Sequence, residues 1–210
     1  MTHAGVGAGV GAHAGVGVHA GVVVPVRAFA LGKARLADAL DDATRSALAR
    51  RWADAVLDAA RDLPVVVVSS DPEVRDWAAA RRATVIDDPG SLDAAADAGR
   101  AEIAGRGCTR VVVAHADLPH ARSFAALVRD GSRPLLAIVP CHRDDGTPVL
   151  SLPTDAPFTF AYGPGSFRRH VAEARARGLG VRVVRDPDLA FDVDVPDDLL
   201  GLPDVVTIPR

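Results

Sequence analysis

Short apolar runs rich in valine, separated by segments with helical periodicity, constrain the fold of this chain more than any other feature. A run that is apolar at every position is typical of a strand buried on both faces, and such strands usually lie in parallel sheets. Because helical segments separate the runs, the order predicts a single-domain, doubly wound α/β fold: a mostly parallel sheet with helices on both faces. The expected strands cover residues 22–26, 65–68, 84–86, 110–114, 135–139, 149–152 and 181–184, and the expected helices cover residues 44–61, 73–81, 91–105, 123–129 and 167–177, with Thr44 as an N-cap.

The size and charge of the chain exclude several classes of protein. Its 210 residues suit one domain, and 24 basic against 27 acidic residues leave a net charge of −3. The small charge imbalance and the aromatic content of 4% argue against a nucleic-acid-binding protein. Cys108 and Cys141 are too few for a disulfide scaffold or a cysteine-built zinc site.

Residues 1–21 differ in composition from the rest of the chain. They consist almost wholly of glycine, alanine, valine and histidine, and no Lys or Arg precedes Arg27. This composition does not fit a signal peptide, and glycine interrupts every apolar run, which argues against a membrane helix. His3, His13 and His19 suggest only weak metal chelation. The expectation is a flexible tail over residues 1–21, one domain over residues 22–210 and a cytoplasmic location.

The residues that follow the first apolar run form a candidate phosphate-binding loop, because ligands of doubly wound sheets bind beyond the carboxyl ends of the strands. The loop contains Arg27, Gly32, Lys33 and Arg35. Backbone amides together with cations can cradle a polyphosphate. Lys33 is the only lysine of the chain, and its compact ammonium is not interchangeable with a guanidinium. The alternative is a solvated basic loop.

Three aspartates are the candidate metal ligands. Asp117 follows the run 110–114, where a carboxylate would face the ligand crevice and could hold Mg²⁺. Asp192 and Asp194 would project to one face of an extended segment, and like charges side by side favour a cation between them. The alternative role for Asp117 is a helix N-cap, whereas Asp197 and Asp198 fit the first turn of a helix and are interpreted as structural. The apolar residues expected to face the core are Phe191, Val193 and Val195.

Two glycine-containing loops complete the candidate site. Residues 144–147 precede a strand and residues 162–167 open a helix. Their free amides and two hydroxyls suit a small phosphate or carboxylate. The alternative is that both are simple turns.

Taken in order, these segments resemble one family, the 2-phospho-L-lactate guanylyltransferases, which include the phosphoenolpyruvate guanylyltransferases of coenzyme F420 biosynthesis. The similarity extends from about residue 22 to residue 200. It implies a Rossmann-like nucleotidyltransferase fold, related to the molybdopterin guanylyltransferases and the GT-A glycosyltransferases. The segments that carry the resemblance are VPVRAFALGKARL, ADLP, DGT before a strand, YGPGSFRRH and LAFDVDVPDDL.

The resemblance implies a reaction and a set of site residues. The phosphate of phosphoenolpyruvate or 2-phospho-L-lactate would attack the α-phosphorus of GTP, and pyrophosphate would leave. Its expected partners are GTP, the acceptor acid, a downstream F420 side-chain transferase and a second copy of the chain in a homodimer, with no nucleic acid and no membrane. The roles it implies are Mg²⁺ binding by Asp117, Asp192 and Asp194, acceptor binding by Thr147, Gly163 and Ser166, and nucleotide-phosphate binding by Arg27, Lys33 and Arg35, with Lys33 also catalytic.

This chain departs from the family pattern in three segments. Ala116 stands where the family usually has Gly, Pro148 where it has Asn, and Asp93 where it has the Asn of a GLN segment. Asp93 is the candidate for contacts to the base or ribose. The alternatives are a related nucleotidyltransferase with a different phosphorylated acceptor, a GT-A glycosyltransferase suggested by the Asp192-x-Asp194 pattern, and a catalytically inactive GTP-binding paralogue.

Overall fold

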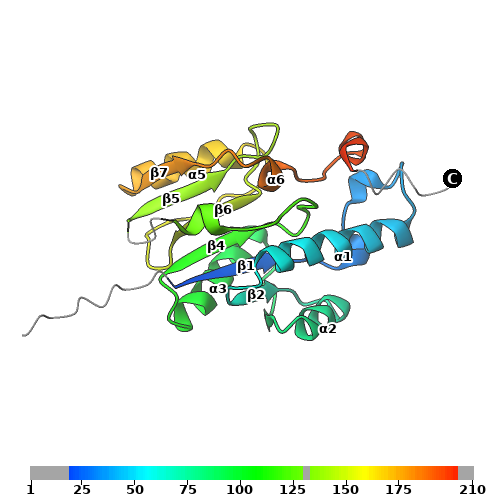
Figure 1. Ribbon diagram of the computed structural model, residues 1–210, viewed down its shortest axis with the longest axis horizontal. Coiled ribbons are helices and arrows are strands. Elements are labelled where there is room, and N and C mark those ends of the chain that lie inside the picture. Colours follow the sequence, from blue (N-terminus) through cyan, green and yellow to red (C-terminus); the bar gives the residue numbers. More distant parts are fainter. Residues whose placement is uncertain (1–18, 130–132, 203–210) are drawn as a thin grey trace, which may run out of the picture.

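A seven-stranded sheet forms the centre of the protein, in the order β3-β2-β1-β4-β6-β5-β7 (Figure 1). The computed structural model describes residues 19–129 and 133–202. All neighbouring strands are parallel except that β6 runs antiparallel to β4 and β5, so the predicted mostly parallel sheet is confirmed. The strands are β1 (Ala20–Pro25), β2 (Val65–Val68), β3 (Thr84–Ile86), β4 (Arg110–Ala114), β5 (Leu135–Val139), β6 (Val149–Pro153) and β7 (Gly180–Val183).

Helices cover both faces of the sheet, as the apolar runs predicted. Buried side chains of α1, α2 and α4 pack with one face, and those of α3 and α5 pack with the other (Figure 1). The reversal of β6 follows from its connection, because the loop 140–148 is too short for a crossover helix. The helices are α1 (Asp42–Ala59), α2 (Pro72–Ala80), α3 (Leu92–Gly105), α4 (Ala125–Val128), α5 (Ser166–Ala176) and α6 (Pro187–Ala190), and the 3₁₀ helices are η1 (Phe29–Leu31), η2 (Ala34–Leu36) and η3 (Pro196–Gly201).

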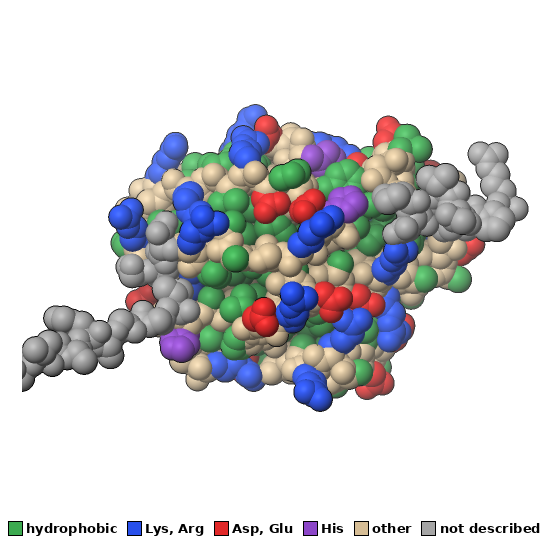
Figure 2. Space-filling view, viewed as in Figure 1, with side chains coloured by type: hydrophobic (Ala, Val, Ile, Leu, Met, Phe, Trp, Pro, Cys, Tyr) green, Lys and Arg blue, Asp and Glu red, His purple; other side chains and the backbone are tan. Residues whose placement is uncertain are grey.

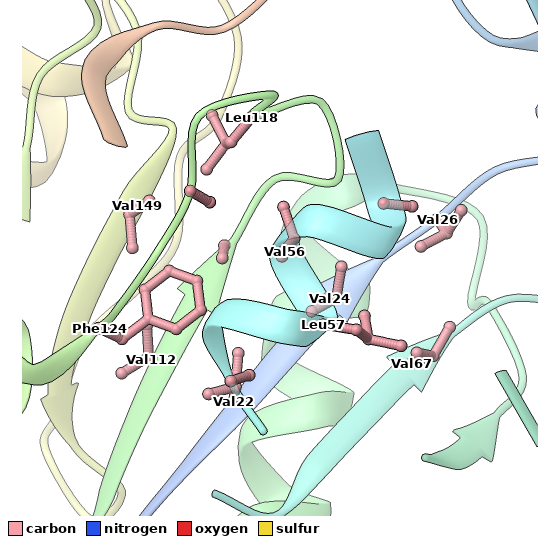
Figure 3. Close-up of a cluster of buried hydrophobic side chains, with 14 of the residues drawn as sticks. Val22, Val24, Val26, Val56, Leu57, Val67, Val112, Leu118, Phe124 and Val149 are labelled. Carbon is pink, nitrogen blue, oxygen red and sulfur yellow. The ribbon is translucent and has the colours of Figure 1, made fainter. Parts of the chain in front are cut away.

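Alternation along β1 divides the core into two layers. Val22 and Val24 face α1 and pack with Val56 and Phe124, as Figure 3 shows. Val23 points to the opposite face and joins the cluster that contains α3. Successive side chains of a strand alternate between faces, so a continuous valine run fills both layers at once.

The starts of several elements differ from the prediction. α1 begins at Asp42 because the side chain of Asp41 accepts a hydrogen bond from the Thr44 amide at 2.7 Å; the prediction of Thr44 as N-cap is wrong. β1 begins at Ala20, two residues earlier than expected, because Ala20 and Gly21 pair with β4. α3 begins at Leu92, one residue later than predicted, because Ser91 is its N-cap and accepts a hydrogen bond from the Ala94 amide at 3.2 Å.

The described surface carries charges of both signs. Acidic and basic side chains are interspersed on the face drawn in Figure 2. None of the helices within residues 19–129 and 133–202 is long and apolar enough to cross a membrane. The prediction of a flexible tail falls, up to residue 18, outside the described residues, and so do His3 and His13.

Two glycines of α3 give opposite predictions for substitution by alanine. A Cβ on Gly99 would lie 2.2 Å from Cγ1 of Val23, whereas a Cβ on Gly105 would meet nothing within 4 Å. We expect Gly99→Ala to lower the free energy of unfolding by about 2 kcal/mol, because overpacking outweighs the gain in helix propensity. Gly105→Ala should raise it by about 0.5 kcal/mol. Urea unfolding of both variants checks this pair, and equal effects would contradict the packing of α3 against β1.

Candidate active site

A pocket of about 330 Å³ lies beyond the carboxyl ends of β1 and β4, where parallel sheets place their ligands. Its walls come from the segment after β1, the start of α3 and the segment after β4. Of the candidate residues, Arg27, Lys33 and Asp117 line it. Arg35 is exposed and Asp93 is half-buried, and neither lines this pocket.

Lys33 lies among the predicted metal ligands. Its ammonium forms an ion pair with Asp117 and lies 3.4 Å from Oδ1 of Asp194, and its side chain is only 12% exposed. The Lys33 backbone is left-handed, with φ of 58°, and its carbonyl accepts a hydrogen bond from the buried Arg45. Arg45, which the sequence analysis missed, therefore helps to fix the turn that aims Lys33 at the carboxylates.

A backbone hydrogen bond brings the two acidic segments together. The amide of Val193 donates to the carbonyl of Asp117 at 3.3 Å, which places Asp192 and Asp194 on either side of this contact. Val193 is buried as predicted, but Asp192 is also buried, at 6% exposure, whereas the Asp194 side chain is 45% exposed. The segment is therefore not a simple alternation of buried apolar and exposed acidic residues.

The charges of this cluster shift its pKa values in opposite directions. Burial raises the pKa of Asp192, and the negative charges of Asp117 and Asp194 raise it further. Burial would also raise the pKa of Asp117, but the charges of Lys33 and His115 and the hydrogen bond from Lys33 together lower it, so this carboxyl titrates below its usual range. Burial opposes the charged form of Lys33, yet the two carboxylates raise its pKa. The cluster thus holds more negative charge than one ammonium neutralises.

Asp198 has the structural role that the sequence predicted. Its Oδ2 accepts hydrogen bonds from the amides of Asp194 at 2.7 Å and Val195 at 2.9 Å, and its other oxygen pairs with Arg143. His142 also lies against this segment: its Nδ1 is 3.4 Å from the carbonyl oxygen of Ala190 and 3.4 Å from Oδ1 of Asp192, with which it makes no hydrogen bond. Nothing in the sequence pattern indicated His142 or Arg143, since only the fold brings the loop 140–148 beside residues 192–198.

The predicted acceptor-binding residues also lie together. The hydroxyls of Ser166 and Thr147 are 3.2 Å apart and both side chains are buried. Gly163 has φ of 98°, a conformation that favours glycine. A Cβ on Gly146 would lie 4.0 Å from Oδ2 of Asp192, so the loop that carries Thr147 borders the acidic cluster.

His170 anchors this second group, and its protonation gives a testable pH dependence. Its Nε2 accepts from the amide of Ala161 at 2.9 Å and its Nδ1 lies 3.1 Å from the Thr147 hydroxyl, which fits the neutral ring with a proton on Nδ1. Burial, with the charges of Arg169 and His115, lowers the pKa of His170 from 6.5 to about 4.

Because the unfolded chain binds this proton near pH 6.5 and the folded chain only near pH 4, acid favours unfolding between these values. We expect wild type to lose up to about 3 kcal/mol of unfolding free energy relative to His170→Gln as the pH falls through this window. Urea unfolding of both proteins at several pH values measures the difference. Curves that stay parallel from pH 6.5 to 4 would contradict the neutral, buried ring.

The donor set fits Mg²⁺. Oδ1 of Asp117 and Oδ1 of Asp192 are buried and make no hydrogen bond, and carboxylate oxygens are the ligands that this hard cation prefers. Within the described residues, no three His, Cys, Asp or Glu side chains converge closely enough to hold a metal by themselves. Mg²⁺ usually takes one or two carboxylates and completes its coordination with waters and substrate phosphates. This geometry therefore fits a Mg²⁺ site whose coordination the phosphates of a bound nucleotide would complete.

Comparison of the sequence with known proteins shows the family to which this chain belongs. A family model described as guanylyl transferase CofC like matches residues 20–203. The chain belongs to this family. The phosphoenolpyruvate guanylyltransferase of Sphaerobacter thermophilus is 41% identical over 185 residues, which cover 84% of this chain and 89% of that protein. The 3-phospho-D-glycerate guanylyltransferase of Phenylobacterium zucineum is 34% identical over 188 residues, which cover 84% of this chain and 86% of that protein.

The fold of this guanylyl transferase agrees with that of solved nucleotide-handling enzymes. A crystal structure from Desulfovibrio desulfuricans, described as a nucleotide-diphospho-sugar transferase, has a TM-score of 0.71 at 18% identity and covers 87% of this chain and 85% of that chain. The predicted fold class and the resemblance found in the motifs are therefore confirmed. The glycosyltransferase alternative, which rested on the spacing of Asp192 and Asp194, is not favoured.

Proposed function

We propose that this guanylyl transferase moves GMP from GTP to the phosphate of phosphoenolpyruvate and releases pyrophosphate, in coenzyme F420 biosynthesis. The observation that supports this acceptor most directly is the 41% identity to a phosphoenolpyruvate guanylyltransferase. 2-Phospho-L-lactate is the alternative acceptor implied by the motifs, and 3-phospho-D-glycerate is the one named for a relative at 34% identity. All three are phosphorylated three-carbon acids, so the reaction class is the same.

The proposed chemistry needs no general base. An oxygen of the acceptor phosphate is already anionic and forms the new bond to the α-phosphorus of GTP. The bond from that phosphorus to the bridging oxygen breaks, and pyrophosphate leaves with the electron pair. Catalysis then depends on positioning and on neutralising the phosphate charge. This is consistent with a site that contains carboxylates, the Lys33 ammonium and the Arg27 guanidinium around a pocket.

Each part of the site has a role in this proposal. Arg27 and Lys33, which line the pocket, bind the triphosphate and stabilise the departing pyrophosphate. The loop that begins at Gly163, with the paired hydroxyls of Thr147 and Ser166 behind it, binds the acceptor acid. Asp117, Asp192 and Asp194 would hold Mg²⁺, which when bound neutralises phosphate charge as a Lewis acid.

Pyrophosphate release tests the proposal. Purified protein is incubated with Mg²⁺ and GTP, ATP, CTP or UTP, and with each of the three acids in turn. The downstream F420 side-chain transferase and its deazaflavin acceptor are present to trap the product. We expect release with GTP and phosphoenolpyruvate. Pyrophosphate release with GTP and only one of the other acids would show that this acid, and not phosphoenolpyruvate, is the acceptor. GTP binding without pyrophosphate release under any condition would indicate an inactive paralogue.

A further inference from the structure

A carboxylate at the start of α3 reaches across to the acceptor loop, the loop that begins at Gly163 and is proposed to bind the acceptor acid. Oδ1 of Asp93 accepts a hydrogen bond of 2.7 Å from the amide of Tyr162, which lies 69 positions later in the chain. Asp93 belongs to the first turn of α3, and the residues before it, Ser91 and Leu92, line the nucleotide pocket. Asp93 itself does not line that pocket. Its carboxylate therefore links the wall of the pocket to the segment that opens the acceptor loop.

The ring of Tyr162 contacts both the nucleotide pocket, through His115, and the acceptor-binding group, through His170. Its ring centroid lies 5.4 Å from that of His115, which lines the pocket, and 4.9 Å from that of His170. His170 in turn lies 3.1 Å from the hydroxyl of Thr147. The next residue along the chain is Gly163, so a shift of the Tyr162 backbone would move the acceptor loop directly.

The backbone around Tyr162 is held from two sides. Arg169 of α5 donates to the carbonyls of Ala161 and Tyr162, both at 2.9 Å. Asp93, at the start of a different helix, α3, accepts a hydrogen bond from the Tyr162 amide. The contacts from Arg169 lie within residues 161–169, whereas the Asp93 contact joins this segment to α3, whose first residues are next to the nucleotide pocket. Removing Asp93 would leave the loop attached to α5 and would remove the hydrogen bond that joins its backbone to α3.

We propose that Asp93 is a positioning residue that couples the nucleotide pocket to the acceptor loop, through its hydrogen bond to the Tyr162 amide. The inference rests on the proposed function only in naming the loop as the acceptor-binding element. It differs from the expectation that Asp93 contacts the base or ribose. A backbone amide requires only an oxygen acceptor, so asparagine can replace aspartate in the positioning role.

Steady-state kinetics of Asp93→Ala and Asp93→Asn test the proposal. We expect Asp93→Ala to raise the KM for the acceptor acid about tenfold, the effect of one lost hydrogen bond to a charged group, and to leave the KM for GTP within about twofold. Asp93→Asn should recover most of the acceptor affinity. Glu102→Ala, which removes only an exposed ion pair with Arg106 on the same helix, is the matched control. A rise in the KM for GTP alone, or no recovery in Asp93→Asn, would overturn the proposal.

Hydrogen exchange separates this proposal from the proposed function. In wild type and Asp93→Asn, GTP is expected to slow amide exchange in residues 161–166, whereas in Asp93→Ala it should not. This measurement needs no acceptor acid and no turnover. If the enzyme accepts none of the three acids but GTP still protects the loop through Asp93, the proposed function fails and the coupling stands. If GTP protects the loop equally in Asp93→Ala, the coupling is wrong whichever acceptor is used.

Discussion

Replacing Asp192 by asparagine is expected to slow guanylyl transfer strongly while making the metal-free protein more stable. The carboxylate is buried beside Asp117 and Asp194, and burial together with these charges raises its pKa. An ionised carboxylate whose pKa is raised by folding destabilises the folded state, so the neutral amide should increase the free energy of unfolding by about 1 kcal/mol. We expect kcat/KM to fall by about 10³, because a charge that serves the reacting phosphates is lost.

Pyrophosphate release and urea unfolding of the same preparation measure the two effects. Asp197→Asn is the control, because Asp197 is an exposed acid in the same part of the chain and should change neither quantity. Loss of activity together with loss of stability would mean that Asp192 is structural. Retained activity in Asp192→Asn would remove it from the site.

Replacing Lys33 by methionine is expected to affect activity and stability together. The ammonium is the ion-pair partner of Asp117 and the near neighbour of Asp194, and its removal leaves two carboxylates without this cation. Breaking a buried pair costs about 3–5 kcal/mol. Since the Asp194 side chain is 45% exposed, we expect about 2–3 kcal/mol in the metal-free protein. The value of kcat/KM should fall by about 10²–10³.

Magnesium distinguishes the two contributions of Lys33. If Mg²⁺ binds the same carboxylates, adding it should reduce the stability loss of Lys33→Met, because the cation supplies the missing charge. Lys33→Arg keeps the charge but changes its geometry, so it should retain most of the stability and recover little activity. A Lys33→Met variant as stable as wild type, or a loss that Mg²⁺ leaves unchanged, would contradict this account of the cluster.

Valine-rich runs predicted the sheet because they specify burial on both faces. The bounds of β2, β3, β4 and β5 match the prediction. The apolar run of β6 does not report its direction, because such a run is the same in a parallel and an antiparallel strand; the short connection of residues 140–148 carries that signal instead. The early start of β1 was not predicted either, because glycine is disfavoured in strands. Gly21 pairs with β4 and leaves room for Ile103, to which a Cβ at this position would come within 2.4 Å.

Site residues were predictable where a sequence motif contains them, and were not predictable where the fold brings together residues that are distant in the chain. Lys33 and Asp117 lie together, as their places after β1 and β4 implied. The partner of Asp93 is a backbone amide distant in the chain, and no side-chain pattern reports such a contact. His142 likewise lies beside Asp192 and Asp198 because the loop before β6 folds back over residues 192–198.

Phosphorus NMR of the reaction mixture tests the central claim, that the acceptor phosphate attacks the α-phosphorus of GTP. Wild-type protein, GTP, Mg²⁺ and phosphoenolpyruvate should yield pyrophosphate and, in equal amount, a pair of mutually coupled diphosphate resonances from guanylylated phosphoenolpyruvate. Both should be missing with Asp192→Asn. Formation of GDP, or of GMP and pyrophosphate without the coupled pair, would show attack at another phosphorus or by water and would contradict the account.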